Sequence, residues 1–165
     1  MRIVLIGFMG SGKTTIGKLL AKKLNLKFIE MDDLTLKLSS RKNINEIFEK
    51  DGEQQFRKLE LLVAKDLAKI DGVIISSGGG VVMNKSTMNY LTKNSSVVYL
   101  KTSFDKIRQQ IKLKKIRPPL FKSIASAKKL LALREPLYEH FANMIVTTDN
   151  KNVGNIVEEI IYGRK

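Results

Sequence analysis

The sequence predicts an α/β protein in which a five-stranded parallel sheet lies between two layers of helices. Short runs rich in Ile and Val alternate with helical patterns along the whole chain, which is typical of right-handed βα crossovers. These runs are apolar on successive residues, as expected of strands that helices cover on both faces. The chain has 165 residues, of which 43% are hydrophobic, enough for one domain with its own core.

The expected strands are short apolar runs at residues 2–6, 27–30, 73–76, 97–101 and 144–147. Helical periodicity extends over residues 13–24, 34–38, 44–69, 85–92, 104–114, 124–141 and 153–162. Asn43 and Glu46 form a typical helix start, with a capping side chain and an acidic residue in the first turn. No repeat or linker composition interrupts the alternation, so residues 1–165 are expected to form a single domain.

The formal net charge of +14 comes from 30 basic and 16 acidic residues. A charge of this size suits nucleic-acid binding, and a nucleotide-dependent nucleic-acid-binding module is one alternative. The lysines are spread along the chain, however, with no basic tail and no helix-turn-helix or RNA-binding motif. This distribution favours a general preference for anionic ligands, and we expect no nucleic-acid partner.

The N-terminal residues 1–10 run into a glycine-rich turn rather than a signal-peptide cleavage site. No stretch of the sequence approaches the length of a membrane-spanning helix, and we expect no membrane partner. The chain contains no cysteine, which excludes disulfides, thiolate metal sites and cysteine nucleophiles. A cytoplasmic protein is expected.

A phosphate-binding loop directly follows the first expected strand. Residues 7–14, GFMGSGKT, match the P-loop pattern G-x-x-x-x-G-K-[ST] and open the next helix, which is the context that the motif requires. Glycines let the backbone N–H groups curl around phosphates, and the helix adds its positive N-terminal end. The expected nucleotide-binding residues are Gly10, Ser11, Gly12, Lys13, Thr14 and Thr15.

The roles of two of these residues follow from P-loop chemistry. Lys13 is expected to contact the β- and γ-phosphates of ATP, and the Thr14 hydroxyl to ligate Mg²⁺. The guanine motif N-K-x-D of GTPases is absent, and the third strand ends in serines rather than in the acidic residue of motor-type ATPases. A small-molecule kinase similar to the nucleoside-monophosphate kinases fits the remaining features best.

Candidate groups for a second substrate follow the second and third expected strands. Asp32 and Asp33 lie just past residue 30, and Gly78, Gly79 and Gly80 end the third strand. Ligands of open α/β sheets bind beyond the carboxyl ends of the strands. A carboxylate there can hold a Mg²⁺-bound water, accept a hydroxyl proton or cap a helix, and three glycines give either a close backbone approach or a plain turn.

Arginine is rare in this lysine-rich chain, which contains seven arginines among its 30 basic residues. Its planar fork binds a carboxylate or phosphate at two points, which lysine cannot do. Arg57, Arg117 and Arg134 lie in settings that suggest such a role, and Arg117 belongs to a basic segment with the character of a lid. A surface ion pair is the commoner use of any single arginine.

Taken together, these motifs resemble those of the shikimate kinase family. The P-loop, the acidic pair, F-R-x-x-E at 56–60, S-S-G-G-G at 76–80, R-P-x-L at 117–120 and R-x-x-L-Y at 134–138 occur in the order and spacing of that family. The resemblance covers essentially the whole chain. It implies a monomer with a nucleoside-monophosphate-kinase-like fold that transfers the γ-phosphoryl group of MgATP to the 3-hydroxyl of shikimate, a step toward chorismate and the aromatic amino acids.

The resemblance also implies site residues, position by position. Asp32 corresponds to the base that contacts the shikimate hydroxyls, Arg57 and Arg134 to the pair that grips the substrate carboxylate, and Gly79 to a backbone donor. It further assigns phosphate contact to Arg117 in a lid at about 112–124, the metal's water shell to Ser76, and adenine contact to Lys151. The segment at about 32–60 would bind the acceptor.

Three residues depart from the pattern of the family. Glu30 replaces an aspartate near the metal, Gln110 replaces an arginine that packs on adenine, and Pro119 replaces a leucine in the lid. The nearest alternative is another small-molecule kinase, such as a gluconate kinase or a nucleoside-monophosphate kinase. The single histidine, His140, is expected on a helix surface.

Overall fold

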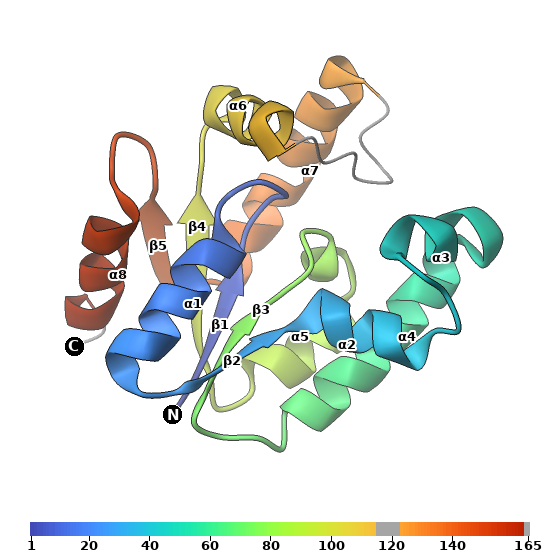
Figure 1. The fold of residues 1–165 in the computed structure, drawn as a ribbon, viewed down its shortest axis with the longest axis horizontal. Coiled ribbons are helices and arrows are strands. Elements are labelled where there is room, and N and C mark those ends of the chain that lie inside the picture. Colours follow the sequence, from blue (N-terminus) through green and yellow to red (C-terminus); the bar gives the residue numbers. More distant parts are fainter. Residues whose placement is uncertain (115–122, 164–165) are drawn as a thin grey trace.

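The computed structural model describes residues 1–114 and 123–163. These residues form a five-stranded parallel sheet with the strand order β2-β3-β1-β4-β5, flanked by helices (Figure 1). The strands are β1 (Arg2–Ile6), β2 (Lys27–Glu30), β3 (Val73–Ser76), β4 (Ser96–Lys101) and β5 (Met144–Thr147). The predicted α/β fold class is confirmed, and the strand boundaries agree with the expected ones to within one residue.

Most of the helices belong to two layers that pack on opposite faces of the sheet, whereas the short helix Ile44–Lys50 packs against the helix that follows it (Figure 1). They are α1 (Lys13–Leu24), α2 (Met31–Leu38), α3 (Ile44–Lys50), α4 (Gly52–Leu67), the 3₁₀ turn η1 (Val81–Met83), α5 (Lys85–Thr92), α6 (Phe104–Lys114), α7 (Ile124–Phe141) and α8 (Val153–Tyr162). In β1, Ile3 and Leu5 join the core beneath α1 and α8, whereas Val4 and Ile6 join the core beneath α4, α5 and α7. Both faces of this strand are therefore covered, which explains its uniformly apolar sequence.

Two expectations about the sheet and its helices are corrected. The edge strands β2 and β5 are only partly buried, because each has a neighbour on one side alone. The helix expected over residues 44–69 is two helices, α3 and α4, which meet at Gly52. The φ angle of Gly52, the first residue of α4, is +82°, a left-handed conformation that prevents one continuous right-handed helix from running through it.

The helix after β2 also differs from the expected one. It begins at Met31 rather than at residue 34, so Asp32 and Asp33 occupy its first turn. Acidic side chains are favoured there by the positive end of the helix dipole. Asn43 does cap α3 as predicted, since its Oδ1 accepts a hydrogen bond from the backbone N–H of Glu46 (2.9 Å).

Other sequence-based expectations concern the surface and the lid. His140 is exposed on α7, as predicted. Most of the proposed lid at 112–124, including Arg117 and Pro119, lies outside the described residues. Across residues 1–114 and 123–163, no helix is both long and apolar enough to cross a bilayer.

Arg2 ties the amino-terminal edge of the sheet to the ends of two helices. Its side chain is only 3% exposed. Its guanidinium group donates hydrogen bonds to the carbonyl oxygens of Leu67 (3.1 Å), Ala68 (2.7 Å), Ile70 (3.1 Å) and Lys93, and to the Ser95 hydroxyl (2.7 Å). The last carbonyls of a helix lack partners within it, and a cation there also complements the helix dipole.

We predict that Arg2→Met lowers the free energy of unfolding by about 2–4 kcal/mol, because buried carbonyls lose a charged donor. Urea denaturation followed by circular dichroism measures this change. Arg108→Met is the matched control, because Arg108 is exposed on α6, and it should leave the midpoint almost unchanged. If Arg2→Met lowers the free energy of unfolding by no more than the control does, the stabilising role of the Arg2 hydrogen bonds is contradicted.

Candidate active site

The phosphate loop joins β1 to α1 at the carboxyl edge of the sheet. Gly10 and Gly12 have φ angles of 77° and 91°, which lie in the region that favours glycine. Lys13 folds back over the loop, and its Nζ donates to the carbonyl oxygens of Gly7 (2.8 Å) and Phe8 (3.0 Å). Burial lowers the pKa of the Lys13 amine to about 8, while Glu30 and Asp32 oppose that shift.

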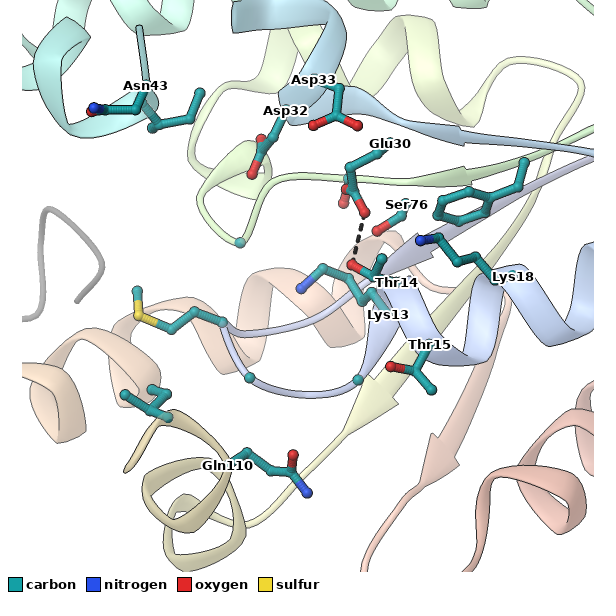
Figure 2. A pocket seen from close by; sticks show the side chains of 18 of the residues that line it. Lys13, Thr14, Thr15, Lys18, Glu30, Asp32, Asp33, Asn43, Ser76 and Gln110 are labelled. Carbon is teal, nitrogen blue, oxygen red and sulfur yellow. Dashed lines mark hydrogen bonds between the residues drawn. The ribbon is translucent and has the colours of Figure 1, made fainter. Parts of the chain in front are cut away.

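Two cavities meet above this loop. The larger, of about 670 Å³, is lined by the loop, by Lys13 and Thr14, and by the acidic residues that follow β2 (Figure 2). The smaller, of about 110 Å³, lies against Arg57, Arg134 and the glycines at 78–80. Both cavities are lined by Met9, Asp32, Ile44 and Gly79, so they adjoin one another. The predicted phosphate-binding residues and two of the predicted arginines, Arg57 and Arg134, thus lie at opposite ends of one crevice.

Side chains that carry oxygen atoms lie near the Lys13 amine. The Thr14 hydroxyl donates a hydrogen bond to Oε2 of Glu30 (2.7 Å), drawn in Figure 2, and Ser76 lies beside them. The Oδ1 atom of Asp32 is buried and has no hydrogen-bond partner within the described ranges. Burial raises the pKa of the Asp32 carboxyl, an effect opposed by Lys13 and Arg57. Burial likewise raises the pKa of Glu30, against the hydrogen bond from Thr14.

This arrangement suits a magnesium ion that a nucleotide brings with it. Mg²⁺ prefers oxygen ligands, keeps several waters, and is commonly held by one or two protein groups together with phosphates. Thr14 and Glu30 supply such groups. Within residues 1–114 and 123–163, no cluster of three or more acidic or histidine side chains could hold a metal ion by itself. The residues therefore fit an ion that depends on bound phosphates.

The glycines at 78–80 are required by what packs against them. A Cβ on Gly78 would lie 2.7 Å from Oε1 of Glu60 and 2.8 Å from Oδ1 of Asp32. A Cβ on Gly80 would overlap the guanidinium group of Arg57. The loop thus brings backbone close to both carboxylates and to the arginine, and any side chain would displace them.

Arg57 is held by two glutamates on its own helix. Its Nη1 pairs with Oε2 of Glu60 (2.5 Å), and its Nη2 pairs with Oε1 of Glu53 (3.0 Å). Glu60 is fully buried, and its other oxygen has no partner among the described residues. Burial raises the pKa of the Glu60 carboxyl to about 7, with Arg57 acting in the opposite direction. The buried Glu60 therefore holds the Arg57 guanidinium group in place, whereas the ion pair with Glu53 is more exposed to solvent.

Arg134 approaches the crevice from α7 and is only 2% exposed. Its Nη1 donates to the carbonyl oxygen of Gly79 (3.3 Å), and its guanidinium carbon lies 5.8 Å from the centre of the Phe8 ring. Its Nε is buried and has no partner in the described part of the chain. One edge of this fork is therefore available to an anionic ligand, such as a carboxylate.

A third cavity, of about 420 Å³, continues from the phosphate loop toward α8. It is lined by loop residues, by Lys106 and Gln110 on α6, and by Thr148 and residues 151–153 after β5. Lys151 lines it, but its Nζ pairs with Oε2 of Glu159 (2.6 Å). Lys151 and Gln110 thus line a cavity that opens from the phosphate loop.

The structure brings together nearly all of the residues that sequence reasoning singled out. Arg117 is the exception, because it lies outside the described residues. Two buried side chains at the site were given no role from sequence, Glu60 and Tyr138. Glu60 lies three residues after Arg57, a helical spacing that indicates a side-chain pair. The Tyr138 hydroxyl bonds to the Gly79 carbonyl, a contact that depends on tertiary packing and leaves no local signal.

A phosphate loop on a parallel sheet, facing an acceptor cavity with two arginines, defines a P-loop kinase similar to the nucleoside-monophosphate kinases. The family model for shikimate kinase matches residues 9–163. The chain belongs to the shikimate kinase family.

Individual relatives agree with this assignment. The chain is 40% identical to a shikimate kinase of Sulfurihydrogenibium sp. over 96% of its length and 95% of that protein. It is 39% identical to one from Caldanaerobacter subterraneus, over 96% of this chain and 93% of the relative. The solved shikimate kinase of Acinetobacter baumannii in complex with shikimate superimposes with a TM-score of 0.91 at 30% identity, covering 99% of this chain and 94% of that one. A deoxyadenosine kinase from M. mycoides with a TM-score of 0.69 and 18% identity, covering 99% of this chain and 98% of that one, shares the fold.

We predict that nucleotide affinity falls as the pH rises past the Lys13 pKa. With a pKa of about 8 in the free protein, Lys13 is neutral above that pH. Binding of phosphates then requires Lys13 to take up a proton, and this requirement lowers the affinity. The dissociation constant for ADP should be constant from about pH 7 to 8 and then rise by roughly tenfold per pH unit. Calorimetric titration checks this, with Lys13→Met as a weaker but pH-independent control. A flat wild-type profile up to about pH 9.5 would contradict the assignment of this pKa.

Proposed function

We propose that this chain transfers the γ-phosphoryl group of ATP to the 3-hydroxyl of shikimate, giving shikimate 3-phosphate and ADP. One observation carries the proposal: Lys13 and the phosphate loop lie at one end of a crevice whose other end holds Arg57 and Arg134. The two ends suit a polyphosphate and a carboxylate, and Asp32 lies between them. Membership of the shikimate kinase family and the likeness to a relative with bound shikimate support the choice of acceptor.

The donor end of the site binds ATP through the phosphate loop. Lys13 supplies positive charge for the β- and γ-phosphates, and Gly10, Ser11, Gly12 and Thr15 line the cavities around them. Mg²⁺, held by Thr14 with Glu30 and Ser76 behind it, would neutralise the charge that develops on the transferred group. Lys151 and Gln110 would border the adenine.

The acceptor end of the site binds the carboxylate of shikimate. Arg134 offers the edge that carries its unpaired Nε, and Arg57 offers a guanidinium group that Glu60 holds in place. Two guanidinium groups fix a planar carboxylate in position and in orientation. The ring hydroxyls then point toward Asp32 and the phosphate loop, with the segment at 32–60 and Gly78, Gly79 and Gly80 around them.

Asp32 acts as the base in this proposal. Its buried oxygen has no other partner in the described ranges, and burial raises its pKa above that of an exposed aspartate, which strengthens it as a proton acceptor. It would orient the 3-hydroxyl in line with the γ-phosphorus and take its proton. Phosphoryl transfer depends mainly on such positioning and on charge neutralisation.

The remaining assignments rest on the sequence. Arg117, in a lid at about 112–124, would contact the phosphates when the substrates are bound. We also propose that the chain functions as a cytoplasmic, single-domain monomer whose partners are small molecules rather than nucleic acid. The net charge of +14 suits the anionic substrates ATP and shikimate.

A panel of acceptors tests the proposed function. ADP release should require shikimate and should be negligible with gluconate or nucleoside monophosphates at the same concentration. Phosphorus NMR of the product should show a phosphate ester on the 3-hydroxyl. Release of ADP that gluconate or a nucleoside monophosphate stimulates more than shikimate does would contradict the proposal.

We predict that Arg134→Met raises the shikimate KM by roughly 30- to 150-fold, which corresponds to the loss of the charge-assisted hydrogen bonds from one guanidinium group to the carboxylate. The KM for ATP should change by less than about twofold, because the phosphate loop is untouched. Lys129→Met is the matched control, since Lys129 is exposed on the same helix. An unchanged shikimate KM in Arg134→Met would remove this residue from the carboxylate site.

A further inference from the structure

Arg57 has two carboxylate partners on its own helix. The Oε1 atom of Glu53 accepts hydrogen bonds from Nε (3.3 Å) and Nη2 (3.0 Å) of Arg57, and Oε2 of Glu60 accepts one from Nη1 (2.5 Å). All three nitrogen atoms of the guanidinium group are therefore paired with glutamates of the chain itself. Glu53 also contacts Arg57 at two of these atoms, which is how an arginine holds the carboxylate of a ligand.

A further carboxylate at this position would upset the local balance of charge. The guanidinium groups of Arg57 and Arg134 carry two positive charges, which two ionised glutamates already balance. Burial lowers the pKa of the Arg134 guanidinium, and the charge of Glu53 is among the effects that oppose this shift, so Glu53 acts on both arginines. Adding the carboxylate of an acceptor would leave a net negative charge in a largely buried place, which is unfavourable unless one glutamate withdraws.

Of the two glutamates, Glu53 is the one positioned to withdraw. The side chain of Glu60 is fully buried, whereas that of Glu53 is 46% exposed and lies in the first turn of α4. The hydrogen bonds from Arg57 to Glu53 are also longer than the one to Glu60. An exposed ion pair of this kind contributes little to stability, so the Arg57 guanidinium can exchange Glu53 for another carboxylate at low cost.

A separate cavity beside Glu53 can receive the displaced side chain. It has a volume of about 590 Å³ and lies between α4 and the start of α5, two helices that pack against each other. Among the described residues that line it, three are basic and one is acidic: Arg57, Lys58, Lys85 and Glu53. The side chains of Lys58 and Lys85 have no ion pair or hydrogen bond in the described part of the chain. A carboxylate that leaves Arg57 for this cavity therefore stays close to cations.

We propose that Glu53 is an internal competitor of the acceptor: its carboxylate occupies Arg57 until the carboxylate of shikimate displaces it. The released side chain then turns into the cavity with Lys58 and Lys85. This inference rests on the proposed function, because the displacing ligand is the acceptor of that reaction. A ligand without a carboxylate has nothing to exchange for Glu53, so the exchange makes the acceptor end of the crevice selective for acids.

Removing the charge of Glu53 tests the competition. We expect Glu53→Gln to lower the shikimate KM by roughly three- to fivefold, the range of one partly exposed ion pair, with kcat and the ATP KM within about twofold. Asp66→Asn is the matched control, because it removes the same charge from an exposed position about 20 Å further along the same helix, and it should leave the shikimate KM nearly unchanged. If Glu53 instead supports the grip of Arg57, Glu53→Gln raises the shikimate KM and the proposal is overturned.

The two lysines give a second test, because their effect should depend on Glu53. Changing Lys58→Met and Lys85→Met together should raise the shikimate KM by roughly two- to threefold in the wild-type background, since the displaced carboxylate loses its cations. The same double change should have no effect when Glu53→Gln is already present. Equal rises in both backgrounds would mean that the lysines merely attract anions, and would overturn the proposed movement of Glu53 into their cavity.

A crystal structure of the wild type with bound shikimate gives a measurement that needs no variant. We expect the Glu53 carboxylate to lie beyond hydrogen-bonding distance of Arg57 and to face Lys58 or Lys85. A Glu53 that still accepts from Nε and Nη2 of Arg57 beside bound shikimate would overturn the exchange. A wild type that does not phosphorylate shikimate would overturn both this inference and the proposed function, whereas turnover with a shikimate KM that Glu53→Gln does not lower would overturn the exchange alone.

Discussion

Charge balance in a confined crevice is the constraint on which the site depends. Among the described residues, eight ionisable side chains line the two cavities, four basic and four acidic: Lys13, Lys18, Arg57, Arg134, Glu30, Asp32, Asp33 and Glu60. A buried charge is costly unless it is paired. Three atoms of this set, Nε of Arg134, Oδ1 of Asp32 and Oε1 of Glu60, are buried without a partner in the described ranges. A carboxylate and a hydroxyl on one acceptor molecule would satisfy the first two.

The backbone makes this concentration of charge possible. The register of the sheet pairs Leu5 and Glu30 with Ser76, so β1, β2 and β3 end at the same level. The phosphate loop, the acidic turn of α2 and the glycines at 78–80 then start from neighbouring points. Those glycines leave no side-chain volume, which lets the carboxylates and Arg57 close around the loop. A parallel sheet thereby converts motifs that are distant in sequence into one crevice.

Much of the fold could be predicted from the sequence because its signals are local. The β1 strand and the phosphate loop are a continuous pattern, and the Asn43 cap is a single side chain beside its helix. The break at Gly52 was not predicted, because helical periodicity on both sides hides one left-handed residue. The early start of α2 was missed for a related reason, since aspartates suit a loop as well as a first helical turn.

The residues of the site likewise fall into two groups: those that local motifs indicate and those whose contacts only the tertiary structure reveals. Lys13, Asp32, Arg57 and Arg134 stand in motifs that carry their chemistry, and their convergence was expected from the sheet topology. The anchoring of Gly79 by Tyr138 joins residues 59 positions apart, so neither local propensity nor spacing reveals it. The support of Arg57 by Glu60 has a helical spacing, but that spacing alone does not distinguish a buried positioning pair from a surface ion pair.

A crystal structure of the ternary complex with shikimate, ADP and a metal fluoride that mimics the transferred phosphoryl group tests the central claim most directly. The account predicts a shikimate carboxylate between Arg57 and Arg134, with its 3-hydroxyl beside Asp32 and in line with the metal fluoride above Lys13. A carboxylate bound away from both guanidinium groups, or a ring turned so that another hydroxyl faces the fluoride, would contradict it.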